Sequence, residues 1–87
     1  MRLIDVREPD EWEICRLPRA ELRPLEEIAT WAQALDPSER LVVYCHHGIR
    51  SLYAALYLSG RGFTDVVNVR GGLDAYSVEA DPQLPRY

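Results

Sequence analysis

The chain contains no lysine, and all ten of its basic residues are arginines. Fourteen aspartates and glutamates outnumber these arginines, so the formal net charge is −4. Proteins that bind nucleic acid or anionic membranes in a general way need a clustered basic surface. The composition therefore argues against both functions, and we expect any anion-binding site to be local.

Long apolar runs are also absent, because no stretch of the sequence approaches the roughly 20 residues that a membrane-spanning helix needs. The chain opens on "MRLIDVRE", which lacks the apolar segment of a signal peptide. We therefore expect a cytoplasmic protein with no membrane partner. Disulfides are unusual in that reducing compartment, so the only two cysteines, Cys15 and Cys45, are expected to be thiols.

The 87 residues are too few for two hydrophobic cores, and neither a linker nor an internal repeat is visible. We expect a single domain over residues 1–87. Segments with strand composition alternate with segments of helical periodicity. The predicted strands are 2–6, 40–44 and 63–69, and the predicted helices are 9–15, 25–35, 51–58 and 73–80. Residues 17–25 are predicted to form a short extended piece at the sheet edge or a connecting loop. Residues 81–87 are predicted to be an irregular tail.

This alternation indicates an α/β fold, with βαβ crossovers, a mostly parallel sheet and helices on both faces. Binding sites in such folds lie beyond the carboxyl ends of the strands. In the predicted helix 51–58 and the residue after it, Leu52, Ala55, Leu56 and Ser59 are expected to share a face. Trp12 and Trp31 are interpreted as packing residues or amphipathic surface residues.

The stretch "VVYCHHGIRS" places Cys45 directly after the predicted strand 40–44 and just before a predicted helix. Gly48 can adopt a positive φ angle, which would curl the backbone and turn its N–H groups inward. With Arg50 at the rim, these N–H groups would form a cradle for anions. Such a cradle stabilises a thiolate and lowers the pKa of its thiol, which makes a nucleophile without a dedicated base. The alternative is an inert buried cysteine, which the spacing of Gly48 and Arg50 disfavours.

Three stretches resemble the single-domain rhodaneses, a family of sulfurtransferases. They are "LIDVREPDEW" at 3–12, "VYCHHGIRS" at 43–51 and "VVNVRGGLDAY" at 66–76. The resemblance implies a rhodanese-like fold with a small, mostly parallel sheet. Because rhodaneses often have an additional strand and helix before the first stretch, we expect an N-terminally short version with about four strands.

The resemblance also implies a thiosulfate sulfurtransferase activity. Cys45 would take a sulfane sulfur from thiosulfate or a protein persulfide, become a persulfide itself, and pass the outer sulfur to a nucleophilic acceptor. This covalent persulfide would replace any separate cofactor. The substrate-binding residues implied are His46, His47, Gly48, Ile49, Arg50 and Ser51.

Asp5 and Arg7 match the first stretch, so the resemblance implies that they help to anchor the active-site loop. An ordinary surface ion pair is the alternative. The end of the chain, "GGLDAYSVEADPQLPRY", is similar to rhodanese domains that are fused to ubiquitin-activating-like enzymes. A ubiquitin-like sulfur-carrier protein is therefore a candidate acceptor.

Two other functions remain open. Cysteine phosphatases and arsenate reductases of the same fold have five residues between cysteine and arginine, whereas four separate Cys45 from Arg50. A rhodanese-like interaction module would normally lack the cysteine. Both features favour sulfur transfer over these alternatives.

His46 and His47, together with the two cysteines, provide four potential zinc ligands. Adjacent residues in a tight loop diverge, and no Cys-x-x-Cys pair is present, so we expect no metal site. The histidines would either line the rim of the cradle or be exposed to solvent. Cys15 is interpreted as a semi-buried structural thiol, with a resolving role for the persulfide as the alternative.

Overall fold

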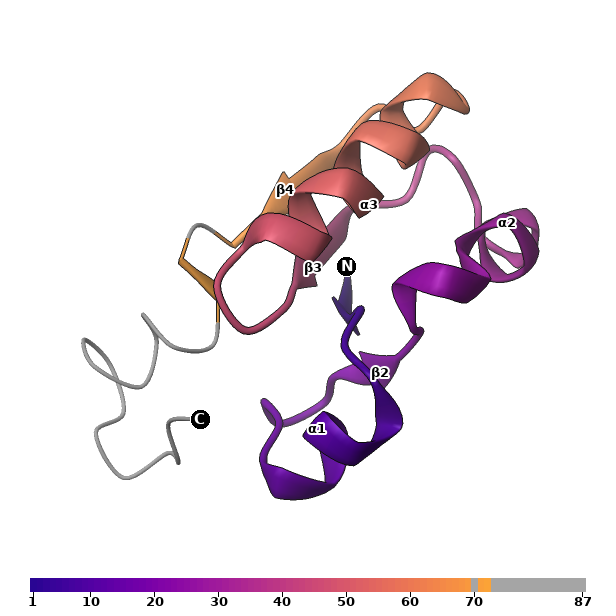
Figure 1. Ribbon diagram of the computed structural model, residues 1–87. Coiled ribbons are helices and arrows are strands. Elements are labelled where there is room, and N and C mark those ends of the chain that lie inside the picture. The colour runs from indigo at the N-terminus through magenta and orange to yellow at the C-terminus, as the bar shows by residue number, and fades with distance from the viewer. Residues whose placement is uncertain (70, 73–87) are drawn as a thin grey trace.

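The computed structural model describes residues 1–69, 71 and 72. Within these residues, four short strands form one all-parallel sheet in the order β2-β1-β3-β4 (Figure 1). The strands are β1 (Arg2–Asp5), β2 (Glu21–Leu22), β3 (Leu41–Tyr44) and β4 (Val66–Asn68). The predicted α/β fold with about four parallel strands is confirmed. The predicted helix 73–80 and tail 81–87 lie outside the described residues.

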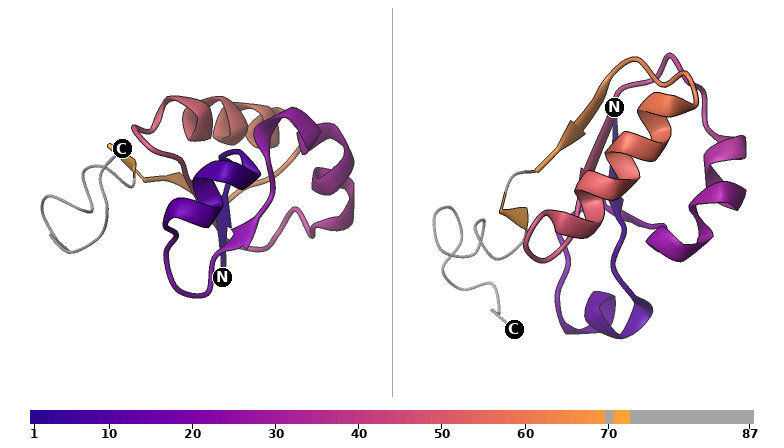
Figure 2. Two further views of the ribbon diagram at one scale, coloured as in Figure 1. Left: turned by 60° about the horizontal axis from the view of Figure 1, so that its bottom comes forward. Right: turned by 45° about the horizontal axis from the view of Figure 1, so that its top comes forward.

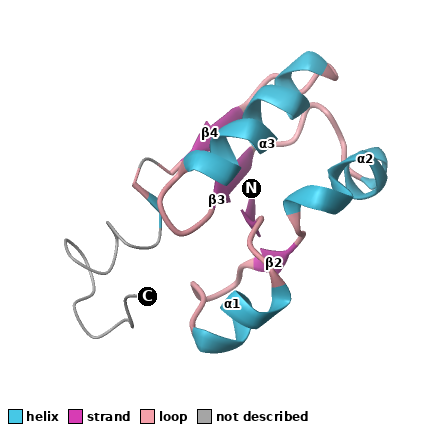
Figure 3. Ribbon diagram, viewed as in Figure 1, coloured by secondary structure: helices cyan, strands magenta, loops and turns pink. Residues whose placement is uncertain are grey.

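The helices alternate with the strands, as the periodicity predicts (Figure 3). They are α1 (Pro9–Ile14), η1 (Leu25–Glu27), α2 (Ile28–Trp31), η2 (Ala32–Ala34) and α3 (Ile49–Gly60). The predicted helix 25–35 is therefore three short pieces, of which only the middle one is α-helical. Trp31 in α2 is 7% exposed, and its indole N–H donates to the carbonyl of Pro24 at 2.9 Å. Its interpretation as a packing residue is confirmed.

The register of the sheet brings the carboxyl ends of three strands to one edge. Asp5 of β1 pairs with Tyr44 of β3, and Asn68 of β4 pairs with the neighbouring Val43. Strand β4 is shorter than predicted: the N–H groups of Phe63 and Thr64 bind the carbonyls of Leu58 and Pro37 rather than those of a neighbouring strand. Cys45 directly follows β3, the strand that lies between β1 and β4.

Helices α2 and α3 lie on the same side of the sheet (Figure 2), and both contribute residues to the larger hydrophobic core. Its buried residues are Ile4, Val6, Ile28, Trp31, Ala32, Leu35, Leu41, Val43, Cys45, Ala54, Leu58 and Phe63. On the opposite face, Tyr44 and Cys15 form a smaller cluster with partly buried Leu3, Leu17, Ala20 and Val69. In the described part of the chain, α2 and α3 thus pack on the same face, and the non-helical segment 15–20 contributes to the other.

The buried face of α3 does not coincide with the face that Leu52, Ala55, Leu56 and Ser59 share. Ser51, Ala54 and Leu58 are buried, whereas Leu52 and Leu56 are 45% and 61% exposed. Ser51 belongs to the buried face, and its N–H and hydroxyl contact the Cys45 sulfur at the start of α3.

Candidate active site

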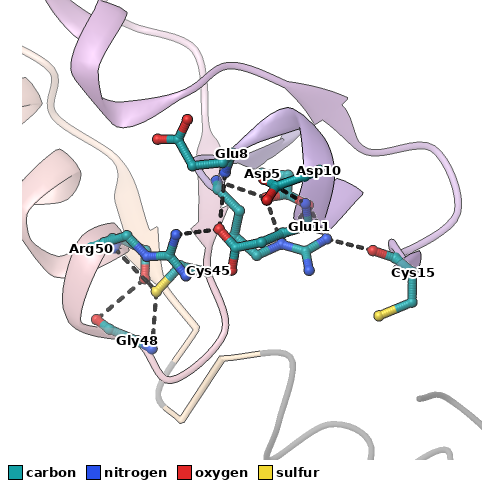
Figure 4. Close-up of polar contacts among 10 residues, drawn as sticks. Asp5, Glu8, Asp10, Glu11, Cys15, Cys45, Gly48 and Arg50 are labelled. Atoms are coloured by element: carbon teal, nitrogen blue, oxygen red, sulfur yellow. Dashed lines mark hydrogen bonds and ion pairs between the residues drawn. The ribbon is translucent and has the colours of Figure 1, made fainter. Parts of the chain in front are cut away.

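The Cys45 sulfur lies at the floor of a loop of inward-pointing donors (Figure 4). The N–H of Gly48 donates to Sγ at 3.0 Å, the N–H of Ser51 at 3.4 Å, and the Ser51 hydroxyl lies at 3.5 Å. Cys45 is 1% exposed, so these contacts are shielded from bulk water. The predicted cradle is present, and it begins where β3 ends.

The environment of Cys45 shifts the pKa of its thiol in two opposing directions. Burial raises this pKa, since it disfavours the charged thiolate. The Ser51 hydroxyl and the backbone N–H groups of Ser51, Gly48 and Arg50 lower it, and they outweigh the burial. The pKa of Cys45 is therefore lower than that of an ordinary cysteine, which favours the nucleophilic thiolate.

Gly48 shapes the loop through its backbone conformation. Its φ is 97°, a left-handed value that L-amino acids with side chains rarely adopt, and it caps the start of α3. A Cβ atom at this position would also lie 3.1 Å from the backbone nitrogen of Gly71 and 3.4 Å from the carbonyl oxygen of Val69. The predicted positive φ at Gly48 is confirmed, and the neighbouring backbone adds a second reason for glycine.

Asn68, which sequence reasoning missed, connects β4 to the loop. Its side-chain amide donates to the carbonyl of Gly48 at 3.4 Å, and its Oδ1 accepts a hydrogen bond from the Ser51 hydroxyl. Because a hydroxyl donates only one proton, Ser51 can serve Asn68 or the Cys45 sulfur, but not both at once. One feature of the sequence could have indicated Asn68 as a site residue: it is an amide in the otherwise apolar run "VVNV", at the carboxyl end of a strand.

Arg50 lies beside Cys45, but its guanidinium is held by a residue that was not predicted (Figure 4). Its Nη1 and Nη2 donate to Oε1 and Oε2 of Glu11 at 2.5 and 2.8 Å. This pairing lowers the pKa of the Glu11 carboxyl and raises the pKa of Arg50. One feature of the sequence could have drawn attention to Glu11: it follows Glu8 by three residues at the start of a helix, and this spacing is typical of a capping box.

Asp5 and Arg7 form an ion pair in which both side chains are 0% exposed. Asp5 accepts the backbone N–H and the Nε–H of Arg7, each at 2.9 Å, and Nη2 of Arg7 at 2.6 Å. Arg7 also donates to the carbonyl of Cys15 at 2.5 Å, and its guanidinium lies 5.8 Å from the centre of the Tyr44 ring. The surface ion pair considered as the alternative is therefore wrong. The pair joins the end of β1 to Tyr44, which directly precedes Cys45.

The two histidines have different environments. His46 is buried at 8% exposure, whereas His47 is exposed, and their ring centroids are 4.1 Å apart. The solvent-exposed interpretation is thus wrong for His46. Ile49, the first residue of α3, is 62% exposed. Among the residues that the structure describes, no group of three histidine, cysteine, aspartate or glutamate side chains is arranged to hold a metal ion.

Cys15 is 9% exposed and packs with Tyr44, which agrees with a semi-buried structural thiol. Both cysteines are thiols in the structure. A surface cleft of about 500 Å³ lies elsewhere, along β2 and the helical pieces around α2, and its lining includes no residue of the Cys45 loop. In residues 1–69, 71 and 72, no helix is long and apolar enough to cross a membrane.

Comparisons with known proteins agree with this fold. Residues 1–79 match the rhodanese-like domain family. The chain is 43% identical to the rhodanese-like/PpiC domain-containing protein 12, chloroplastic, of Arabidopsis thaliana, over 99% of the chain and 30% of that protein. It is 39% identical to the thiosulfate sulfurtransferase GlpE of Pseudomonas syringae, over 85% of the chain and 70% of that protein.

The chain thus spans less than a third of the Arabidopsis relative, and it spans only 23% of the probable adenylyltransferase/sulfurtransferase MoeZ of Mycobacterium tuberculosis, at 36% identity. Among solved structures, a rhodanese-like domain protein from Staphylococcus aureus superimposes with a TM-score of 0.82 at 30% identity. That match covers 99% of this chain and 80% of the other. Fold and sequence thus agree, and the chain belongs to the rhodanese-like domain family.

Proposed function

We propose that the domain is a sulfurtransferase in which Cys45 carries the sulfur as a persulfide. The observation that supports this most directly is the set of donors around the Cys45 sulfur, with Gly48 N–H at 3.0 Å and Ser51 N–H at 3.4 Å. These donors stabilise a thiolate before the reaction, and they can stabilise the anionic persulfide after it. Neither step requires a metal ion or a separate cofactor.

In the proposed reaction, the Cys45 thiolate attacks the sulfane sulfur of thiosulfate. A sulfur–sulfur bond forms to Cys45, the bond between the sulfane sulfur and the sulfonate sulfur breaks, and sulfite leaves with the electron pair. A nucleophilic acceptor such as cyanide then attacks the outer sulfur of the persulfide. Thiocyanate leaves, and the Cys45 thiolate is restored with no net oxidation of the protein.

The physiological donor and acceptor can also be proteins. One relative is named as a putative sulfur carrier protein and another as an adenylyltransferase/sulfurtransferase, so transfer to a ubiquitin-like sulfur carrier is part of the proposal. A reducing compartment such as the cytoplasm would keep Cys45 available as a thiol.

Loop length supports sulfur over phosphate as the group that is transferred. Four residues separate Cys45 from Arg50, one fewer than in the cysteine phosphatases that the loop otherwise resembles. The first test is to measure thiocyanate formation from thiosulfate and cyanide beside hydrolysis of an aryl phosphate. We expect the wild type to form thiocyanate. The rate of thiocyanate formation should be at least about a hundredfold lower in Cys45→Ala, since the nucleophile is removed. Phosphate release without thiocyanate formation would reverse the assignment.

A further inference from the structure

We propose that Glu11 holds the Arg50 guanidinium beside the Cys45 cradle and, by compensating its charge, weakens the binding of dianionic sulfur donors. Glu11 would thus be a positioning residue that determines donor specificity. This inference rests on the proposed sulfur transfer, to which it adds a means of selecting the donor.

The Glu11 carboxylate is itself fixed before any substrate arrives. It is the third residue of α1, and its Oε1 accepts the backbone N–H of Glu8 at 3.1 Å. Both of its oxygens bind Arg50, and its side chain is only 17% exposed. A two-point, partly buried pair of this kind is stronger and more rigid than a typical surface ion pair.

The pair also joins the two elements that frame the cradle. Helix α1 follows β1, α3 follows β3, and these strands are neighbours in the sheet. A guanidinium has five N–H donors, and Glu11 accepts two of those of Arg50. The remaining donors keep a fixed orientation in which they can bind an anion.

The same contact changes the charge at the cradle. Arg50 contributes one positive charge and Glu11 one negative charge, so the pair is neutral. Attraction for a donor then depends on partial charges, namely those of the backbone N–H groups of the loop and of the Arg50 N–H groups that Glu11 does not bind. Thiosulfate has two negative charges and would be affected more than a neutral or singly charged reagent.

Glu11→Gln tests this proposal, because it removes the charge but keeps a side chain of the same size next to Arg50. Glutamine is also accepted at the third position of a capping box, so α1 should still form. Its amide oxygen can accept one hydrogen bond from Arg50, while the compensating charge is lost. We expect the KM for thiosulfate to fall roughly three- to tenfold at low salt, with kcat within about twofold of the wild type.

Glu13→Gln is the matched control. Glu13 is an exposed residue on the same helix, so this variant removes the same charge without touching the Glu11–Arg50 pair. We expect its KM to stay within about twofold of the wild type. An equal fall in KM in both variants, or an unchanged or higher KM in Glu11→Gln, would overturn the proposal.

A second measurement separates this inference from the proposed function. Cys45 is alkylated with anionic iodoacetate or with neutral iodoacetamide, and peptide mass spectrometry measures the rate of each reaction. In Glu11→Gln, the ratio of the iodoacetate rate to the iodoacetamide rate should rise, while Glu13→Gln leaves it unchanged. If the wild type does not turn over thiosulfate, the proposed function fails, yet this ratio still decides whether Glu11 compensates the charge. An unchanged ratio in Glu11→Gln would overturn the inference even if the wild type is active.

Discussion

Single residues set the reactivity of Cys45 through a balance between burial and hydrogen bonds. Burial alone would leave an inert neutral thiol, as in many cysteines at strand ends. The donors of Ser51 and Gly48 outweigh that effect and lower the pKa of the Cys45 thiol. Because each donor supplies part of this shift, removing one of them should raise the pKa of the Cys45 thiol.

We expect the rate of Cys45 alkylation by iodoacetamide to rise with pH at a midpoint below that of an ordinary cysteine. The thiolate is the reactive form, so a lowered pKa moves this rise to lower pH. Ser51→Ala removes the hydroxyl donor to the sulfur but keeps the backbone N–H. Its midpoint should therefore lie at higher pH than that of the wild type. A midpoint equal to the wild-type value would show that the hydroxyl interacts with Asn68 instead of the thiolate.

At the scale of elements, the site depends on the short turn between β3 and α3. Gly48 starts the helix in a left-handed conformation, close to the backbone that follows β4. The N–H groups of the first helical turn point at Cys45 only if this turn is kept. The position of the helix and the binding of the sulfur are thus two results of one backbone conformation.

Gly48→Ala should therefore weaken both folding and function. Left-handed φ values cost a residue with a side chain about 1–2 kcal/mol, and the added Cβ would contact backbone atoms near 3.1 Å. We expect the free energy of unfolding in urea to fall by at least that amount, together with slower persulfide formation.

Gly60→Ala is the control for this variant. Gly60 ends the same helix, and a Cβ atom there would have no heavy atom within 4 Å. Because alanine favours helices over glycine, this variant should be as stable as the wild type or slightly more stable. If both substitutions had the same effect on stability, the left-handed turn at Gly48 would not be the constraint we describe.

At the scale of the whole molecule, the sequence predicts features that depend on local patterns. The alternation of strands and helices, the position of Cys45 at a strand end and the positive φ at Gly48 are all local, and the structure shows each of them. The face that α3 buries was not predictable in this way, because the apolar Leu52 and Leu56 lie outside and Ser51 lies inside. Ser51 contacts the cysteine sulfur on the buried face, and apolar periodicity does not report such a contact.

The site residues that sequence reasoning missed are long-range partners. Glu11 is 39 positions from Arg50, and Asn68 is 17 positions from Ser51. Both reach the loop only because β1, β3 and β4 are neighbours in the sheet. The strand order, rather than any motif, brings these side chains to Cys45.

The central claim, that Cys45 carries a transferable sulfur, is tested most directly by intact mass spectrometry after treatment with thiosulfate and removal of reductant. We predict that the wild type gains the mass of one sulfur atom, that cyanide removes this mass, and that Cys45→Ala never gains it although Cys15 is still present. A wild type that gains no sulfur, or a gain that persists in Cys45→Ala, would contradict the account.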